Sequence, residues 1–231
     1  VETGFWLESD RMLSLDFSER SLEVQRGVVM EEFKQRCLNQ PYGDVGHLLR
    51  PLAYQTHPYQ WPTIGKELSH IANATLEEVK AFFFRFYAPN NAVLAVTGNI
   101  SWEETVRLTE KWFAPIPRRN VPVRQLPQEV VQTAERRQTV ERNVPLDALF
   151  MAYHMCSRED ADYYAFDILS DILSNGRSSR LTRRLVQEQK FFSSLDAYIS
   201  GTRDAGLLHI SGKPSAGVSL EQAEAAVRKE L

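Results

Sequence analysis

The stretch from Ser18 to Cys37 constrains the fold more than any other part of the sequence, because its pattern predicts one long amphipathic helix. Ser18 is a good N-cap residue, and Glu19 follows in the first turn, where the helix dipole favours negative charge. A helix with an apolar stripe must pack that stripe against a core. The stripe consists of Leu22, Val29, Phe33 and Cys37.

Glu32 is the exceptional residue of this predicted helix. It lies three residues after Val29 and four after Val28, so its carboxylate flanks the apolar stripe instead of pointing directly into water. A carboxylate at the edge of an apolar face costs free energy unless a partner pairs with it. Two interpretations stay open at this point. Glu32 either reaches solvent, alone or in an i,i+4 pair with Arg36, or it serves as a ligand for a metal ion.

The composition is that of a globular protein and excludes several classes of partner. At 231 residues the chain has roughly one and a half times the length of an average domain. Its hydrophobic content of 43% is enough for a core. The formal net charge of −3 provides no basic footprint for nucleic acid or anionic lipid. No apolar run is long enough for a membrane span, so we expect neither nucleic acid nor a membrane span.

Both ends of the sequence favour an excised piece of a longer protein. The chain opens on Val1 instead of Met, and Leu231 falls inside a predicted helix. No N-terminal signal sequence is present, which for an excised piece says little about compartment. Cys37 and Cys156 stand far apart without C-x-x-C spacing, so they are predicted to be buried free thiols, with a single disulfide as the alternative.

The first half is predicted to contain mainly helices. Two capping boxes, at Thr75 and Ser101, open helices that run to about Tyr87 and Phe113. Ala92–Thr97 lies between these helices and is typical of a short strand that is buried on both faces. Further helices are predicted at residues 1–12 and 44–53, and a proline-rich loop at residues 57–62.

A stretch rich in proline and arginine, residues 115–128, has almost no periodic apolar signal, so we place a domain boundary there. Beyond it strands alternate with helices, and one turn joins two strands. This pattern favours an α+β fold over a doubly wound one. The predicted strands cover residues 137–144, 148–154, 192–199 and 207–211, and the predicted helices cover residues 160–173, 178–189 and 219 onwards.

Several common catalytic motifs are absent from the sequence. There is no G-x-S-x-G nucleophile elbow, no G-x-G-x-x-G, and no complete phosphate-binding loop. No two histidines have helical i,i+3 or i,i+4 spacing, so no local cluster supplies the three protein ligands of a catalytic zinc site. Each histidine is predicted to be structural or exposed: His47, His57, His70, His154 and His209. Taken alone, these residues indicate an α+β fragment with one unusually placed carboxylate.

Four segments resemble, in the same order, the pitrilysin/insulinase metallopeptidases, a family that includes the mitochondrial processing peptidases and the core subunits of the respiratory bc1 complex. Arg26-x-x-Val29-x-x-Glu32 is similar to the family's E-R-x-x-V-x-x-E segment, with Gln25 in place of its first Glu. The resemblance covers almost the whole chain. The other matching segments are His57–Gly65 (H-P-Y-x-x-P-x-I-G), Phe82–Gly98 (helix, P-x-N turn and core strand) and Gly176–Leu181 (G-x-S-S-R-L).

The resemblance implies that Glu32 is the third zinc ligand of the parent protein, with Gln25 and Arg26 in supporting positions. The neutral Gln25 removes the charge that the family has at this position. The family's H-x-x-E-H motif supplies two histidine ligands and the general base, and its usual spacing places it upstream of Val1. We therefore expect zinc in the full-length parent. This fragment is expected to hold no catalytic residue and to be metal-free and inactive.

The resemblance also implies an α+β architecture of two related units. Residues 1–114 would be the latter part of the first, zinc-bearing type of peptidase domain, without its N-terminal part. Residues 115–128 would be the linker. Residues 129–231 would be the second, inactive-type domain, truncated at its C-terminal end.

Two functional hypotheses follow from the family. The parent is either a zinc endopeptidase that hydrolyses peptides in a closed chamber, or a non-catalytic partner or scaffold subunit of the same fold that binds peptide or a catalytic subunit. Members that act in pairs often carry an Arg and a Tyr seven residues apart to hold substrate. The matching positions here are Val186 and Ser193, which argues against a partner-type subunit.

The expected partners are a peptide or unfolded polypeptide substrate and a related subunit in a homo- or heterodimer. The substrate-binding residues, the cleavage preference and the compartment stay open, with the bacterial cytoplasm or periplasm favoured.

Overall fold

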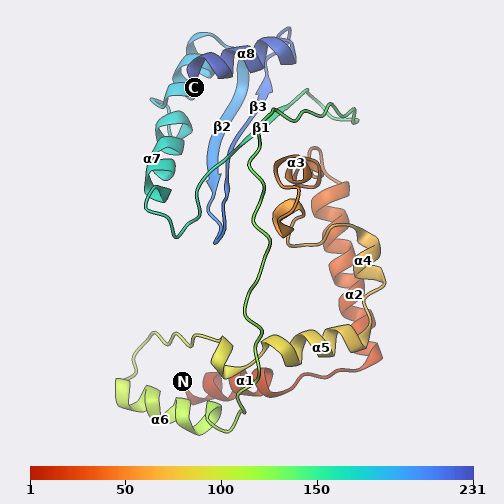
Figure 1. Cartoon of the computed structure of the whole chain (residues 1–231), viewed down its shortest axis with the longest axis vertical. Coiled ribbons are helices and arrows are strands. Elements are labelled where there is room, and N and C mark those ends of the chain that lie inside the picture. The colour runs from red at the N-terminus through yellow and green to blue at the C-terminus, as the bar shows by residue number, and fades with distance from the viewer. The chain divides into compact units, whose positions relative to one another are not determined.

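All 231 residues are described by the structure, a computed structural model, and they divide into two compact units (Figure 1). The first unit contains Val1–Lys34 and Ile64–Leu126, and the second contains Gln35–Thr63 and Pro127–Leu231. Helices and one sheet make up the fold, in agreement with the predicted mixture of the two. The assignment to two related peptidase domains stays a prediction. In the structure, residues 35–63 group with the second half of the chain.

The first unit is built from helices. Thr75 and Glu78 form the predicted capping box before α5, and the Ser101 hydroxyl accepts a hydrogen bond from the Glu104 N–H before α6. Helix α1 lies against α6, where Lys111 Nζ is 2.6 Å from Glu2 Oε1. The bounds are α1 (Glu2–Leu13), α2 (Glu19–Phe33), α4 (Leu68–Ala72), α5 (Leu76–Phe86), the 3-10 turn η3 (Pro89–Asn91) and α6 (Trp102–Phe113).

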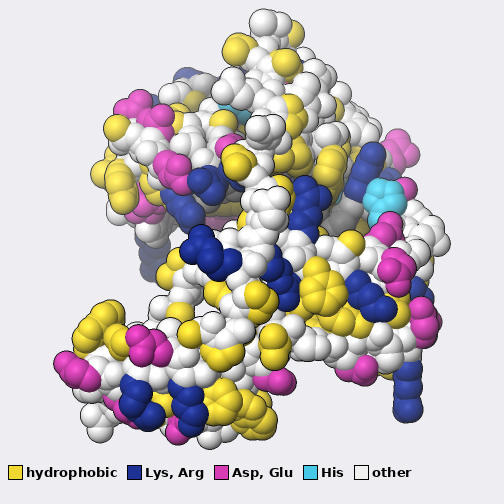
Figure 2. Space-filling model, turned by 60° about the horizontal axis from the view of Figure 1, so that its bottom comes forward, with side chains coloured by type: hydrophobic (Ala, Val, Ile, Leu, Met, Phe, Trp, Pro, Cys, Tyr) yellow, Lys and Arg dark blue, Asp and Glu magenta, His cyan; other side chains and the backbone are white.

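Residues 92–97 do not form the predicted strand, and this part of the sequence prediction was wrong. Val93 is 96% exposed, although a strand buried on both faces would hide it. The physical reason is that the first unit contains no other strand, so no neighbouring backbone completes a ladder. Other apolar side chains of the first unit are exposed like Val93, among them Phe82 and Trp102. Hydrophobic side chains lie among the charged ones on the face shown in Figure 2.

The predicted Ser18–Cys37 helix is present, but it changes geometry near its end. Ser18 caps α2 in a capping box with Ser21, and after Phe33 the chain continues as a π-helix, η1 (Lys34–Leu38). Phe33 and Cys37 are buried, as the apolar stripe requires. Both cysteines are free thiols, as predicted, but only Cys37 is buried, whereas Cys156 is half-buried. Burial raises the pKa of each thiol.

The second unit is organised around a three-stranded antiparallel sheet. Its strands are β1 (Leu149–His154), β2 (Phe192–Ser200) and β3 (Leu207–Pro214), in the order β1-β3-β2. The predicted strand at residues 137–144 is not formed, because its backbone makes no ladder with β1 or β3. The helical segments of this unit are α3 (Val45–Ala53), η2 (Pro58–Gln60), α7 (Tyr163–Ser174), the π-helix η4 (Thr182–Glu188) and α8 (Leu220–Glu230).

Side chains alternate between the two faces of this sheet. Each face is covered by different elements of the second unit (Figure 1). On one face, α7, η4 and α8 enclose the main core around the almost inaccessible Leu181, Leu185 and Ile210. On the other face, Ala53 and Tyr54 at the end of α3 pack against Leu207. Residues 35–63 therefore act as the second cover of the sheet.

Glu129 anchors this cover to the rest of the second unit. Its carboxylate accepts hydrogen bonds from the backbone N–H groups of Gln55, Thr56 and His57, with donor–acceptor distances of 2.9, 3.0 and 2.9 Å. Burial opposes ionisation of this carboxylate, but these hydrogen bonds and one from the Thr56 hydroxyl outweigh it and lower the pKa of Glu129 to about 2.

We expect this carboxylate to make the stability of the chain depend on pH. Because the pKa of Glu129 falls from 4.5 to about 2 on folding, its stabilisation is complete above pH 4.5 and is lost as the pH falls towards 2. Glu129→Gln should lower the free energy of unfolding at pH 7 by about 1–3 kcal/mol. The variant should also lose less stability than the wild type between pH 5 and pH 2, as measured by urea denaturation.

Glu110→Gln is the matched control, since Glu110 is exposed on α6, and it should change the free energy of unfolding by less than about 0.5 kcal/mol. Parallel pH profiles for the wild type and Glu129→Gln would contradict the anchoring role.

Candidate functional site

Glu32, the predicted metal ligand, lies in the last turn of α2 directly before the buried Phe33, and its side chain is half-buried. The adjacent Glu31 is exposed and forms an ion pair with Lys34 at 3.5 Å. The two neighbouring glutamates therefore have different environments, and Glu32 has the one expected of a residue at the edge of the apolar stripe. Its role as a zinc ligand stays a prediction.

Arg26, a predicted supporting residue, connects α2 to the segment between α4 and α5. One terminal nitrogen donates a hydrogen bond to the backbone oxygen of Ala74 at 2.6 Å, and another forms an ion pair with Glu23 one turn earlier on α2. The Nε atom of Arg26 is buried without a hydrogen-bond partner. Arg26 lies six residues before Glu32 on the same helix. Its guanidinium thus fixes the position of the helix that carries Glu32. Gln25, the other predicted supporting residue, is exposed on α2.

The residues of this chain do not by themselves form a metal centre. No group of three or more His, Cys, Asp or Glu side chains is placed to hold a metal ion. A catalytic zinc site requires three protein ligands, and Glu32 supplies one carboxylate. The half-buried position of Glu32 fits a residue that supplies one ligand of a metal site. The residues around it do not supply a complete site.

Three histidines have structural roles in the second unit, as predicted. His57 is 4% exposed, its Nε2 lies 3.1 Å from Asp204 Oδ2, and its Nδ1 accepts a hydrogen bond from the Tyr59 N–H. His154 Nε2 lies 2.7 Å from the backbone oxygen of Ala53. Burial, with a smaller contribution from Arg50, lowers the pKa of His209 to about 4, so this imidazole is neutral at pH 7.

Sequence reasoning missed how the His57 loop is held. His57 itself was visible as part of a motif, but its partners Asp204 and Glu129 are 147 and 72 residues away along the chain. Asp204 lies in the turn between β2 and β3, and Glu129 lies in an extended segment without periodicity. Neither position has a sequence signal of its own beyond being a carboxylate in a loop.

The Arg26 geometry predicts a stability effect. Arg26→Ala removes the hydrogen bond to the Ala74 oxygen and the ion pair with Glu23, so we expect the free energy of unfolding to fall by about 1–3 kcal/mol in urea denaturation. The control is Arg20→Ala on the same helix, where the side chain is exposed, and its effect should be below about 0.5 kcal/mol. Equal effects of the two substitutions would show that Arg26 does not fix α2.

Comparison with known proteins finds relatives that are named zinc proteases. The zinc protease PqqE of Helicobacter pylori is 29% identical over 218 residues, which are 92% of this chain and 48% of that protein. An uncharacterised zinc protease of Bacillus subtilis, YmxG, is 24% identical over 96% of this chain and 53% of its own length. The chain thus spans about half the length of these curated relatives.

Solved structures show the same likeness. The crystal structure of a protease from Helicobacter pylori superposes with a TM-score of 0.89 at 27% identity, covering 99% of this chain and 55% of that one. The profile of the peptidase M16 inactive domain matches residues 73–231, which is more than half of the chain. The relatives are named zinc proteases, which agrees with a metalloprotease parent. On this evidence the chain belongs to the peptidase M16 family.

Proposed function

We propose that this chain is part of a zinc-dependent endopeptidase that hydrolyses peptides in a closed chamber, and that Glu32 is one of its zinc ligands. The observation that carries the proposal is the half-buried Glu32 on α2, a helix that Arg26 fixes in place, in a chain of the M16 family. We propose further that the parent binds a related subunit, as a homo- or heterodimer, and takes peptides or unfolded polypeptides as substrates.

Each residue has a distinct part in this proposal. When bound, zinc polarises a scissile carbonyl and lowers the pKa of a bound water. The Glu32 carboxylate would contribute one oxygen ligand from the end of α2. Arg26 would act as a positioning residue, because it holds α2 at Ala74 without reaching the metal. The remaining ligands and the general base would come from outside residues 1–231 of this chain.

The alternative is a non-catalytic partner or scaffold subunit of the same fold. The match of residues 73–231 to the inactive domain is compatible with it, because that match covers none of α2. Glu32 favours the enzyme, since an idle subunit has no need for a carboxylate at that position. Val186 and Ser193 favour it too, because they stand where partner subunits of the family often carry Arg and Tyr.

The first test is to read the coding sequence that precedes Val1 in the source genome. We expect an H-x-x-E-H motif about 45 residues upstream, following the family spacing. A corresponding segment with its histidines or its glutamate replaced would overturn the enzyme proposal in favour of the partner subunit.

The second test measures zinc directly in the full-length protein. Glu32→Gln should lower the bound zinc, determined by elemental analysis after dialysis, by tenfold or more, because a neutral amide is a poor substitute for a ligand carboxylate (~1.4 kcal/mol per tenfold). Peptide cleavage should fall in parallel.

Glu31→Gln is the matched control, one residue away and exposed, and it should retain the zinc content and the activity of the wild type. If both variants retain zinc equally, Glu32 is not a ligand.

A further inference from the structure

Helix α7 is followed directly by an asparagine–glycine pair, Asn175-Gly176, which is the single Asn-Gly dipeptide of the sequence. Both residues are exposed. Glycine has no Cβ, so its backbone nitrogen is open to the side chain of the preceding residue. Whether that nitrogen can react with the asparagine side chain depends on how firmly the main chain between the two residues is held.

The peptide group that joins Asn175 to Gly176 makes no hydrogen bond. On one side of it, the Asn175 N–H donates to the Asp171 oxygen at 2.9 Å and closes the last turn of α7. On the other side, the Gly176 oxygen accepts hydrogen bonds from the Ser179 N–H at 3.2 Å and from the Ser179 hydroxyl at 2.7 Å. The Asn175 oxygen and the Gly176 N–H lie between these fixed points and have no partner. Rotation of this one peptide group therefore breaks no hydrogen bond.

The backbone angles at this pair allow such a rotation. Asn175 has a φ of −80° and a ψ of 104°, and Gly176 has a φ of 88°. A half-turn of the peptide group would make ψ of Asn175 and φ of Gly176 both negative, and glycine adopts either sign of φ about equally well. Around the Cβ position of Gly176 there is no other atom within 4 Å, so the rotation meets open space. A negative ψ brings the Gly176 nitrogen towards Cγ of the Asn175 side chain.

The Asn175 side chain is held by one exposed contact. Its Nδ2 atom donates a hydrogen bond to Asp171 Oδ1 at 2.9 Å. A hydrogen bond of this kind contributes only about 0.5–1.5 kcal/mol, so the amide leaves it readily and can meet the Gly176 nitrogen.

We propose that Asn175 is a site of spontaneous deamidation. Hydroxide removes the proton of the Gly176 N–H, and the nitrogen attacks Cγ of Asn175. A bond from this nitrogen to Cγ forms, the bond from Cγ to Nδ2 breaks, and Nδ2 leaves as ammonia with a proton from water, which restores the hydroxide. Water then opens the five-membered succinimide ring at either carbonyl, which gives aspartate or isoaspartate. The net reaction consumes one water molecule and releases one ammonia molecule, and it involves neither zinc nor Glu32.

Either product weakens the junction between α7 and η4. Aspartate at position 175 replaces the donor to Asp171 by a second carboxylate, and like charges at i,i+4 repel each other. Isoaspartate adds one carbon to the main chain between the last hydrogen bond of α7 and the hydrogen bonds between Gly176 and Ser179. We therefore expect the modified chain to be loosened at this junction.

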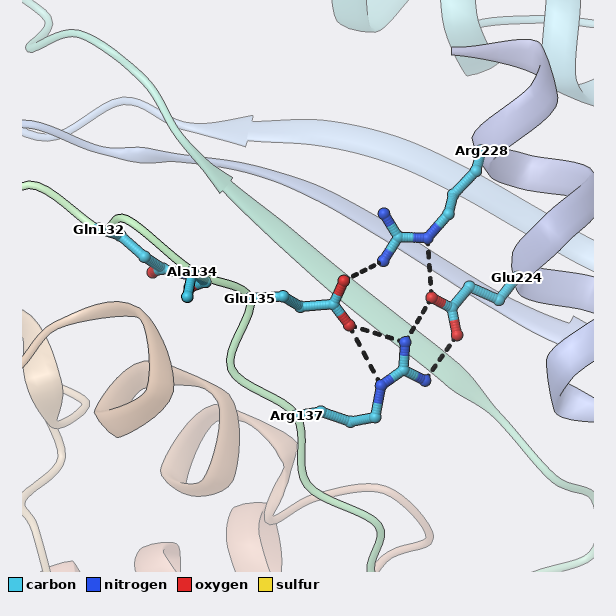
Figure 3. Close-up of polar contacts among 6 residues, drawn as sticks. All are labelled: Gln132, Ala134, Glu135, Arg137, Glu224 and Arg228. Atoms are coloured by element: carbon cyan, nitrogen blue, oxygen red, sulfur yellow. Dashed lines mark hydrogen bonds and ion pairs between the residues drawn. The ribbon is translucent and has the colours of Figure 1, made fainter.

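The rest of the second unit should stay folded, because η4 and α8 have attachments of their own. Arg184 of η4 forms an ion pair with Glu230 of α8 at 3.0 Å. Glu224 of α8 accepts two hydrogen bonds of 2.6 Å from Arg137 (Figure 3). Arg137 belongs to residues 129–141, the extended segment that faces β1. None of these contacts passes through Asn175.

The test incubates the folded 231-residue chain in oxygen-labelled water at mildly alkaline pH and follows it by tryptic digestion and mass spectrometry. Residues 159–177 form one tryptic peptide, and Asn175 is its only asparagine. We expect this peptide to gain one labelled oxygen atom with time and to separate into two products, aspartate and isoaspartate. A sample taken at the start corrects for deamidation during the digestion.

Two asparagines of the same chain are internal controls. Asn99 and Asn120 are exposed like Asn175, but each precedes a β-branched residue, whose side chain shields its backbone nitrogen. Asn175 should be converted at least about tenfold faster than either of them. In Asn175→Gln the attack would have to close a six-membered ring, so residues 159–177 of this variant should stay unmodified over the same time.

A synthetic peptide of residues 171–180 measures the reaction without the fold. Because the peptide group after Asn175 is unbonded, the folded chain should react within about tenfold of the rate of this peptide. A rate in the folded chain as low as that of Asn99 and Asn120 would mean that the pair is held rigidly, and it would overturn the proposal. Aspartate without isoaspartate would overturn it as well, because a succinimide opens to both.

Amide hydrogen exchange checks the structural consequence. In the deamidated chain, separated by ion exchange, the amides of residues 175–181 should exchange several-fold faster than in the unmodified chain, whereas those of β2 and β3 should keep their protection. Unchanged exchange at residues 175–181 would contradict the loosening of the junction, and a loss of protection in β2 and β3 would contradict its confinement to that junction.

Discussion

The hydrogen bonds that the Glu129 carboxylate accepts from the backbone of Gln55, Thr56 and His57 underlie the organisation of the second unit. They join two segments that are far apart in the sequence and place Tyr54 over Leu207, so that the sheet is covered on both faces. An ionised carboxylate that satisfies three backbone donors at once is stabilising because each donor would otherwise be desolvated without a partner. The same carboxylate anchors one end of the segment that faces β1.

Local patterns predicted most of the helices. Ser18 caps its helix as predicted, and Thr75 caps its helix through the predicted capping box, since a cap depends only on residues within one turn. The strands Leu149–His154, Phe192–Ser200 and Leu207–Pro214 were also foreseen. The half-buried position of Glu32 agrees with its place beside the apolar stripe. In all these cases the information lies within a few residues of the element itself.

Features that depend on distant partners were not predictable in the same way. Ala92–Thr97 has the composition of a core strand, but a strand exists only where another backbone pairs with it, and the first unit supplies none. The same reason applies to residues 137–144 beside β1. The candidate site has this limit as well: the sequence locates Glu32, but the hydrogen bond from Arg26 to the Ala74 oxygen joins residues 48 positions apart.

The exposed segment Ala92–Thr97 has a consequence for handling the chain in solution. It combines high strand propensity with the absence of charge and of proline, and its Val93 is almost fully accessible. Segments of this kind pair readily with identical segments of other molecules, which leads to self-association and aggregation. Concentrated samples of the 231-residue chain would therefore aggregate through this stretch first. A single lysine at position 93 would be the simplest way to keep them monodisperse.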